Sequence, residues 1–175
     1  MNYFELYGLP VSFHPDPAAV KNKYYELSRK HHPDRFAQAG GNELADALRM
    51  AAANNDAYKT LRSADATMAY ILKLHGLLED EEKYSLPPAF LMEMMDLNEA
   101  VSDYEMEPAN EQARQLALGA TKEQLQAWAA NATALTTSYN NSAPDNALLI
   151  QVKDMYFRKK YLLRIQERID KFATR

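Results

Sequence analysis

Residues 29–35 read RKHHPDR, and this short stretch lies between two amphipathic runs of the sequence. In the run before it, four residues at helical spacing share one face: Val20, Tyr24, Leu27 and His31. This helix should begin at Asp16 and Pro17, because an aspartate followed by a first-turn proline is a typical helix start. It should end by His32, because the residue before a proline avoids helical geometry.

The run after it is preceded by Gly40-Gly41, which predicts a loop over residues 36–42. A second helix should open at Asn42 or Glu43. One stripe of this helix is formed by Leu44, Leu48, Ala51 and Asn55. The sequence therefore predicts a helical hairpin whose connecting loop carries His32-Pro33-Asp34.

Two segments outside this hairpin loop add to the pattern: residues 3–10 read YFELYGLP, and residues 55–61 read NDAYKTL. Together with His32-Pro33-Asp34 they resemble the J-domain family, the partners of heat-shock chaperone ATPases. Residues 3–10 are similar to the family's short first helix and its stop, and residues 55–61 are similar to its third-helix signature. The resemblance implies that the loop contacts the nucleotide-binding domain and linker of such a chaperone and triggers its ATP hydrolysis.

Residues 69–76 read AYILKLHG and residues 90–93 read FLME, and both segments are similar to the HscB family, the J-proteins of iron–sulfur cluster assembly. The resemblance spans nearly the whole chain. It departs at Met68, where the family usually has a basic residue, and it weakens over residues 108–145. It implies a co-chaperone that binds an IscU-like scaffold and delivers it to a chaperone of the HscA/DnaK type, whose ATPase it stimulates. The alternative is a J-domain co-chaperone for a different client outside cluster metabolism.

Composition limits the possible functions independently. The chain has 175 residues, a net charge of −4 and no cysteine, so disulfides, thiolate metal sites and a cysteine nucleophile are excluded. Such a protein cannot hold an iron–sulfur cluster through cysteines. It has no glycine-rich phosphate loop, so we expect it neither to bind nor to hydrolyse ATP. We also expect no cofactor and no enzymatic activity, because the context of His32-Pro33-Asp34 is that of the J-domain family. No apolar run reaches the roughly 18 residues of a membrane span and no signal peptide opens the chain, so we expect a cytoplasmic protein without a membrane partner.

The chain should be all-α and should divide into two domains. Residues 1–75 carry 9 basic and 8 acidic side chains, whereas residues 76–175 carry 11 and 16, which indicates different partners for the two parts. We assign residues 1–76 to a J-domain, residues 77–87 to a linker and residues 88–175 to a three-helix bundle. The linker contains Glu79-Asp80-Glu81-Glu82 and Leu86-Pro87, which interrupt helical periodicity.

The bundle helices should run from about Pro88 to Glu107, within residues 109–141, and from Pro144 to near Phe172. The middle helix is open to an interruption at Gly119-Ala120, after which Thr121 and Gln124 form a possible capping box. In the last helix, a seven-residue repeat predicts packing against neighbours along the whole length: Leu148, Met155, Leu162 and Ile169.

The J-domain resemblance implies that the chaperone-binding site combines the loop with a basic patch, which faces an acidic groove of the chaperone and speeds encounter. Two other interpretations stay open. The histidines and Asp34 could form a metal or acid–base site, although their spacing matches no zinc pattern, and the loop could be an ordinary solvated turn. We expect neither a metal site nor a nucleic-acid partner, since the basic run is short and lacks interleaved aromatics. The predicted chaperone-binding residues are His32, Pro33, Asp34, Lys21, Arg29, Lys30 and Arg35.

The scaffold-binding site should lie on the first bundle helix. Its core stripe is Phe90, Met94, Leu97, Val101 and Tyr104, and methionines and acids alternate on the opposite face. This mixture suits a partner with a basic surface and apolar pockets. The other interpretation is that Met92 and Met95 rest on a neighbouring helix and the acids are merely solvated. The HscB resemblance implies scaffold contact by Leu91, Met92, Met95, Asp96, Glu99 and Asp103, with Phe157 on the last helix, whose phase predicts that it points outward.

Overall fold

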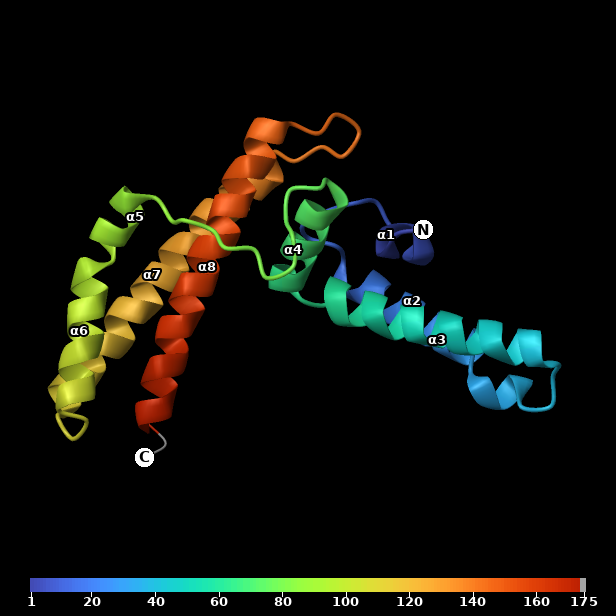
Figure 1. The fold of residues 1–175 in the computed structure, drawn as a ribbon, viewed down its shortest axis with the longest axis horizontal. Helices are drawn as coiled ribbons and strands as arrows, with labels where there is room; N and C mark the ends of the chain where they lie inside the picture. Colours follow the sequence, from blue (N-terminus) through green and yellow to red (C-terminus); the bar gives the residue numbers. More distant parts are fainter. Residues whose placement is uncertain (174–175) are drawn as a thin grey trace. The chain divides into compact units, whose positions relative to one another are not determined.

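The computed structural model describes residues 1–173, and within that range it contains helices and no strand (Figure 1). The predicted all-α fold is therefore confirmed. The chain divides into two compact units, Met1–Gly76 and Leu77–Arg175, which we describe separately. No helix in the described range is long and apolar enough to span a bilayer.

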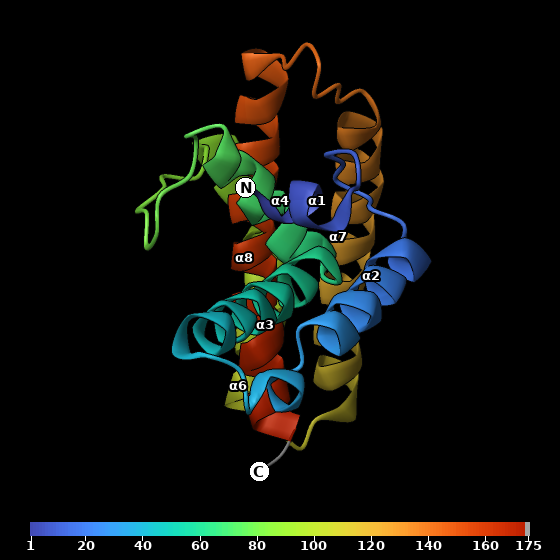
Figure 2. The same cartoon turned by 90° about the vertical axis from the view of Figure 1, so that its right-hand side faces the viewer.

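The N-terminal unit is built around a hairpin of two helices. Its elements are α1 (Tyr3–Tyr7), α2 (Pro17–Lys30), a short 3-10 helix η1 (Pro33–Phe36), α3 (Gly41–Leu61) and α4 (Ala64–Leu74). Helices α2 and α3 lie side by side in both views, and η1 lies in the loop that joins them (Figures 1 and 2). The predicted hairpin is thus present.

The helix ends follow the local signals of the sequence. Asp16 caps α2 by accepting the amide hydrogen of Ala18, and Pro17 occupies the first turn, as predicted. Helix α1 ends at Gly8, whose φ of 63° lies in the left-handed region that favours glycine. Helix α3 begins at Gly41, slightly earlier than the predicted Asn42.

The buried stripe of α3 differs from the predicted one. Leu48 is 51% exposed and Asn55 is exposed, whereas the buried residues are Ala47, Asn54, Ala57 and Leu61. Apolar periodicity could not separate these adjacent stripes, because alanines lie on both of them. Which stripe of α3 is buried depends instead on polar groups of α1 and α2, because these groups need a buried hydrogen-bond partner on α3.

Asn54 is that partner, and it links three helices. Its side-chain oxygen accepts a hydrogen bond from the Tyr7 hydroxyl of α1 at 2.8 Å. Its amide nitrogen donates to the Tyr24 carbonyl and to Ser28 Oγ of α2, both at 3.0 Å. Burial raises the pKa of Tyr7 well above its usual value.

We expect Asn54→Leu to destabilise the chain by about 1–3 kcal/mol, because leucine has a similar size but leaves buried polar partners unsatisfied. Asn55→Leu is the matched control, since Asn55 is exposed and the change should cost less than about 0.5 kcal/mol. Urea unfolding followed by circular dichroism measures both changes. Equal midpoints for the two variants would show that the Asn54 contacts carry no net stability.

The C-terminal unit is a bundle of three long helices preceded by one short helix. Its elements are α5 (Pro88–Glu93), α6 (Met95–Met106), α7 (Glu111–Thr137) and α8 (Asn146–Ala173). The core contains the predicted α6 stripe together with residues from α7 and α8: Phe90, Met94, Leu97, Val101, Tyr104, Ala117, Leu162, Ile165 and Ile169. The stripe predicted for the first bundle helix is therefore buried as expected.

Two local predictions for the bundle were wrong. The first bundle helix is broken at Met94, whose backbone (φ −86°, ψ −1°) separates α5 from α6. Helix α7 is continuous through Gly119, and Thr121 is buried inside it with its hydroxyl donating to the Ala117 carbonyl, so it forms no capping box. The predicted packing along the whole of the last helix is confirmed by buried residues from Leu149 to Ile169, although Leu148 and Met155 of the seven-residue repeat are only half-buried.

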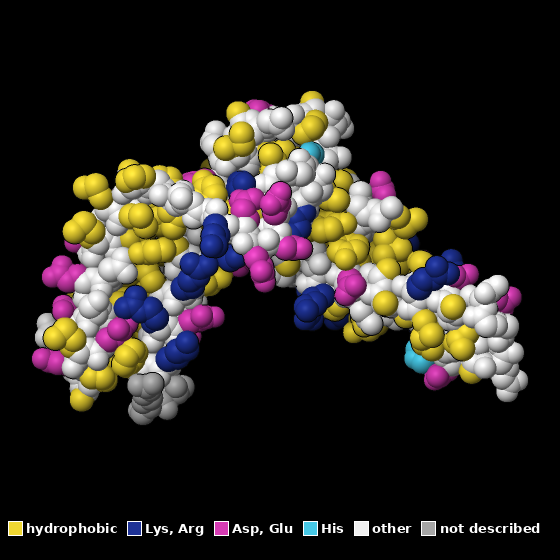
Figure 3. All heavy atoms as spheres, in the orientation of Figure 1, with side chains coloured by type: hydrophobic (Ala, Val, Ile, Leu, Met, Phe, Trp, Pro, Cys, Tyr) yellow, Lys and Arg dark blue, Asp and Glu magenta, His cyan; other side chains and the backbone are white. Residues whose placement is uncertain are grey.

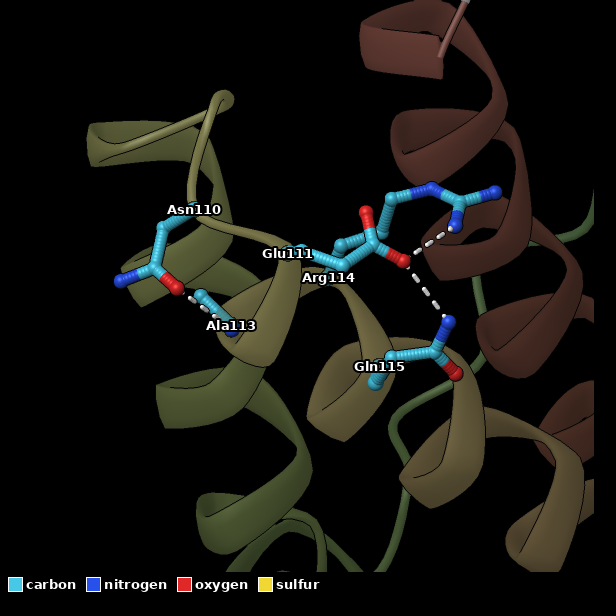
Figure 4. Close-up of polar contacts among 5 residues, drawn as sticks. All are labelled: Asn110, Glu111, Ala113, Arg114 and Gln115. Carbon is cyan, nitrogen blue, oxygen red and sulfur yellow. Dashed lines mark hydrogen bonds and ion pairs between the residues drawn. The ribbon is translucent and has the colours of Figure 1, made fainter.

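The N-terminus of α7 is capped earlier in the chain, at Asn110 (Figure 4). The Asn110 side chain accepts the amide hydrogen of Ala113 at 3.1 Å. Glu111 accepts hydrogen bonds from Gln115 and Arg114, which hold its side chain over the first turn and lower its pKa. An acid in this position is favourable because the N-terminus of a helix carries partial positive charge.

Candidate functional site

The loop of the N-terminal unit presents His32 and Asp34 to solvent. His32 caps η1 through Nδ1, which accepts the amide hydrogen of Asp34 at 3.3 Å. The same nitrogen lies 3.6 Å from the Asp34 carboxylate, and the two side chains are 57% and 91% exposed. While Nδ1 accepts, the neutral imidazole carries its proton on Nε2, which remains free to donate to a partner.

Two features hold this loop in one conformation. Pro33 fixes φ at the start of η1. Arg35 donates a hydrogen bond from its guanidinium to the Arg29 carbonyl at 2.9 Å, which anchors η1 to the last turn of α2. His32 and Asp34 are therefore presented together on a constrained turn.

The structure brings three of the four predicted basic residues close to the loop in sequence and in space. Arg29 and Lys30 lie in the last turn of α2, and Arg35 lies in η1. Lys21 is exposed, but it lies eight residues before Arg29, about 12 Å along the helix axis. The loop end of the hairpin is thus positively charged, and Lys21 stands apart from it.

The predicted scaffold surface is exposed along α5 and α6. The exposed fractions are 42% for Leu91, 70% for Met92 and 64% for Met95. These values exclude the interpretation in which the two methionines rest on a neighbouring helix. Figure 3 shows hydrophobic and acidic side chains interspersed along this part of the C-terminal unit.

The acids of this surface are available to a partner. Asp96, Glu99 and Asp103 form no hydrogen bond or ion pair through their side chains with any residue in the range 1–173. From Phe90 to Glu107 the sequence has six acids and no base. We call Met95, Asp96, Glu99 and Asp103 the α6 face; they share one side of α6.

Phe157 does not point outward, and that prediction was wrong. It is only 8% exposed, and its ring stacks on Tyr84 with centroids 4.4 Å apart and planes inclined by 7°. The helical phase on α8 does leave it outside the stripe that meets α6 and α7. The segment before α5 covers it instead, which a phase argument for one helix cannot detect.

This covering segment, residues 77–87, is attached to α8 by polar contacts. The Tyr84 hydroxyl donates to the Asp154 carboxylate at 2.7 Å, and Lys153 pairs with Glu82 at 2.7 Å. Burial and the hydrogen bond to Asp154 raise the pKa of Tyr84 to about 12. The predicted linker is therefore packed against the bundle over its second half.

Two groups of residues were missed by the sequence analysis. Tyr84 was treated as part of a linker. It is the only aromatic residue in this acidic segment, and a large, partly apolar side chain in such a segment indicates packing against the domain that follows. The basic character of α8 was also missed, although lysines and arginines recur between residues 153 and 171. Within residues 1–173, no group of three or more histidine, aspartate or glutamate side chains is arranged to hold a metal ion.

Comparison with known proteins gives matches to a family model and to curated relatives. Residues 86–170 match a family model described as the HSCB C-terminal oligomerisation domain. A co-chaperone protein HscB homolog from Cupriavidus taiwanensis is 41% identical over 103 residues, which are 58% of this chain and 58% of that protein. The match therefore spans less than two thirds of the length of that curated relative.

Solved structures extend the similarity to both units. Chaperone HscB from Vibrio cholerae matches with a TM-score of 0.74 and 25% identity, covering 99% of this chain and 98% of that chain. The resemblance to the HscB family is confirmed. Human co-chaperone protein HscB matches with a TM-score of 0.77 and 28% identity, covering 97% of this chain and 81% of that chain.

The HscB family model includes α5 and α6, and with them the exposed methionines and acids. It begins at residue 86, so Tyr84 and Glu82, which attach the covering segment to α8, lie outside the matched range.

Proposed function

We propose that this chain is a non-enzymatic co-chaperone with two binding surfaces. The loop His32-Pro33-Asp34 binds a chaperone of the HscA/DnaK type and stimulates its ATPase. The C-terminal unit binds an IscU-like scaffold and delivers it to that chaperone. The observation that carries the proposal is the presence, in one HscB-like chain, of a constrained exposed His-Pro-Asp loop on one unit and an exposed methionine–acid surface on the other.

The loop acts by contact and charge. An exposed carboxylate at Asp34 can pair with an arginine of the chaperone, and a free Nε2–H of His32 can donate to a carbonyl or carboxylate nearby. The bases at the loop end, Arg29, Lys30 and Arg35, attract an acidic groove and raise the rate of encounter. The ATP is bound and hydrolysed by the chaperone, and this chain changes only the chaperone's conformation.

The scaffold surface acts by a different combination of forces. Leu91, Met92 and Met95 offer exposed, flexible apolar area that suits shallow apolar pockets. The acids of the α6 face attract a basic partner and set its orientation. We do not assign Phe157 a direct contact with the scaffold, because the Tyr84 ring covers it.

We expect Met92→Ala/Met95→Ala to weaken binding of an IscU-like scaffold by about 2 kcal/mol, or roughly 30-fold, because exposed apolar anchors are typical hot spots. Stability should change little, since both side chains are mostly exposed. Isothermal titration of the full-length variant with the scaffold measures the affinity. Leu48→Ala/Ile150→Ala is the matched control, because these residues are 51% and 56% exposed and lie outside the surface.

The same titration separates the proposal from its alternative, a J-domain co-chaperone for a client outside cluster metabolism. If the scaffold binds the wild-type chain and the double variant equally well, the α5–α6 surface is not the scaffold site. If the scaffold does not bind the wild-type chain while ATPase stimulation persists, the client is a different protein.

A further inference from the structure

A pocket of 440 Å³ lies in the N-terminal unit, where the start of α2 meets the end of α3 and the start of α4. Its volume is within the range of about 300–1,000 Å³ that is typical of ligand pockets in proteins. In Figure 1, the end of the hairpin next to α4 lies opposite the end that carries η1. We call this feature the α2–α4 pocket, and the proposed function does not use it.

The floor of the α2–α4 pocket is apolar. Buried side chains of Phe13, Val20 and Leu61 line it, together with the half-buried ring of Tyr58. Filling such a pocket removes apolar surface from water, which is favourable for a ligand that carries a large apolar group.

The rim of the pocket is basic. Lys21 and Arg62 line it, and both residues are exposed. Neither side chain forms a hydrogen bond or an ion pair with any residue that the structure describes. Among the described residues, no aspartate or glutamate lines the pocket, and the nearby Asp16 uses its carboxylate to cap α2. The positive charge at the rim is therefore left for a ligand to neutralise.

Arg62 is held in place by a stack of aromatic rings. Its guanidinium carbon lies 5.3 Å from the Tyr58 ring centroid, and Tyr58 stacks in turn on Tyr24 with centroids 4.2 Å apart. The Tyr24 hydroxyl donates to the side-chain oxygen of Asn55 at 3.3 Å. A stacked guanidinium keeps its N–H donors at its edge, where they can bind a carboxylate through two parallel hydrogen bonds. Because the side chain is already held, less conformational entropy is lost on binding.

Lys21 belongs to this pocket by its position. It was predicted to act with the loop His32-Pro33-Asp34, but ten residues separate it from His31, or about 15 Å along α2. Arg62 comes from the far end of α3. The fold brings these two bases, which are distant in sequence, to the rim of one apolar pocket.

We propose that the α2–α4 pocket binds an acidic peptide segment of a partner protein. A carboxylate of the segment pairs with Arg62 and Lys21, and a large apolar side chain of the same segment fills the pocket. A nucleic acid is a poorer occupant, because two bases neutralise few phosphates and residues 1–75 carry 9 basic and 8 acidic side chains. The site is separate from the loop and from the α5–α6 surface, so it does not rest on the proposed function.

The test is a two-dimensional ¹H–¹⁵N NMR titration of the full chain with three acetylated and amidated peptides. The peptide GDLFDG has both acids and large apolar side chains, GNLFNG lacks the acids, and GDGGDG lacks the apolar side chains. GDLFDG should shift the amide signals of residues that line the pocket, with a Kd on the order of 1 mM or lower. The other two peptides should bind at least about fivefold more weakly, because each lacks one of the two contributions.

A double variant tests the basic rim. Lys21→Gln/Arg62→Gln should weaken binding of GDLFDG by at least about tenfold, because the carboxylates lose both cationic partners. Lys59→Gln/Lys122→Gln is the matched control, since it removes the same charge from two exposed bases outside the pocket and should leave the affinity unchanged. Circular dichroism checks the fold. If loss of the Arg62–Tyr58 contact disturbs α3, Lys21→Gln by itself replaces the double variant, because Lys21 is exposed.

Four results would overturn the proposal. They are the absence of shifts up to about 10 mM GDLFDG, shifts that lie outside the pocket, equal binding of GNLFNG or GDGGDG, and unchanged affinity of the rim variant. A short thymidine oligonucleotide that binds the pocket more tightly than GDLFDG would also overturn it, because the occupant would then be a nucleic acid. Neither chaperone nor scaffold is present, so the result is independent of the proposed function.

Discussion

The Asp34→Asn substitution is expected to abolish stimulation of the HscA/DnaK-type chaperone's ATPase while the N-terminal unit stays folded. The side chain is 91% exposed, and its carboxylate lies 3.6 Å from His32 Nδ1. Exposed contacts of this kind contribute little to stability, so the free energy of unfolding should change by less than about 0.5 kcal/mol. Asparagine keeps the shape of the side chain but removes the charge that pairs with a chaperone arginine.

Steady-state ATP hydrolysis by the chaperone, measured over a range of co-chaperone concentrations, gives the result directly. Asp56→Asn is the matched control, because Asp56 is an exposed acid of α3 away from the loop. Circular dichroism and scaffold titration of the Asp34 variant should match the wild type. If the variant stimulates hydrolysis normally, the loop is an ordinary solvated turn, and the J-domain part of the proposed function fails.

The largest loss of stability is expected for Phe157→Ala, at about 3–5 kcal/mol. The ring is 8% exposed, stacks on Tyr84 and has a T-shaped contact with Tyr156. Its removal leaves a cavity under residues 77–87 and exposes the face of Tyr84, which loses its packing partner. Truncating an exposed aromatic side chain would lower the free energy of unfolding much less.

Chemical unfolding of the full chain measures this loss. Tyr84→Phe is the companion variant, because it retains the stacked rings and removes only the hydroxyl that donates to Asp154. Its cost should be about 0.5–1.5 kcal/mol, the usual net contribution of one hydrogen bond, because Asp154 keeps its ion pair with Arg158. An unchanged unfolding midpoint for Phe157→Ala would mean that the covering segment is not docked on α8 in solution.

The sequence by itself determined the features that depend on local chemistry. Asp16 and Pro17 start α2, Gly8 ends α1, and Pro33 stops the hairpin helix, because each acts on the backbone within a few residues. The buried stripe of α6 was also predictable, since its large apolar residues recur at helical spacing. The exposed surface opposite that stripe, with Met92 and Met95, followed from the same periodicity.

Only the tertiary structure decided the features that depend on a distant partner. The buried stripe of α3 is the one that contains Asn54, because the Tyr7 hydroxyl and Ser28 require a buried polar partner. Phe157 is buried because Tyr84, far away in sequence, stacks on it. Helical phase states which side of a helix a residue occupies, but burial depends on what packs there. That packing depends on contacts between residues far apart in the chain, which periodicity within one helix does not contain.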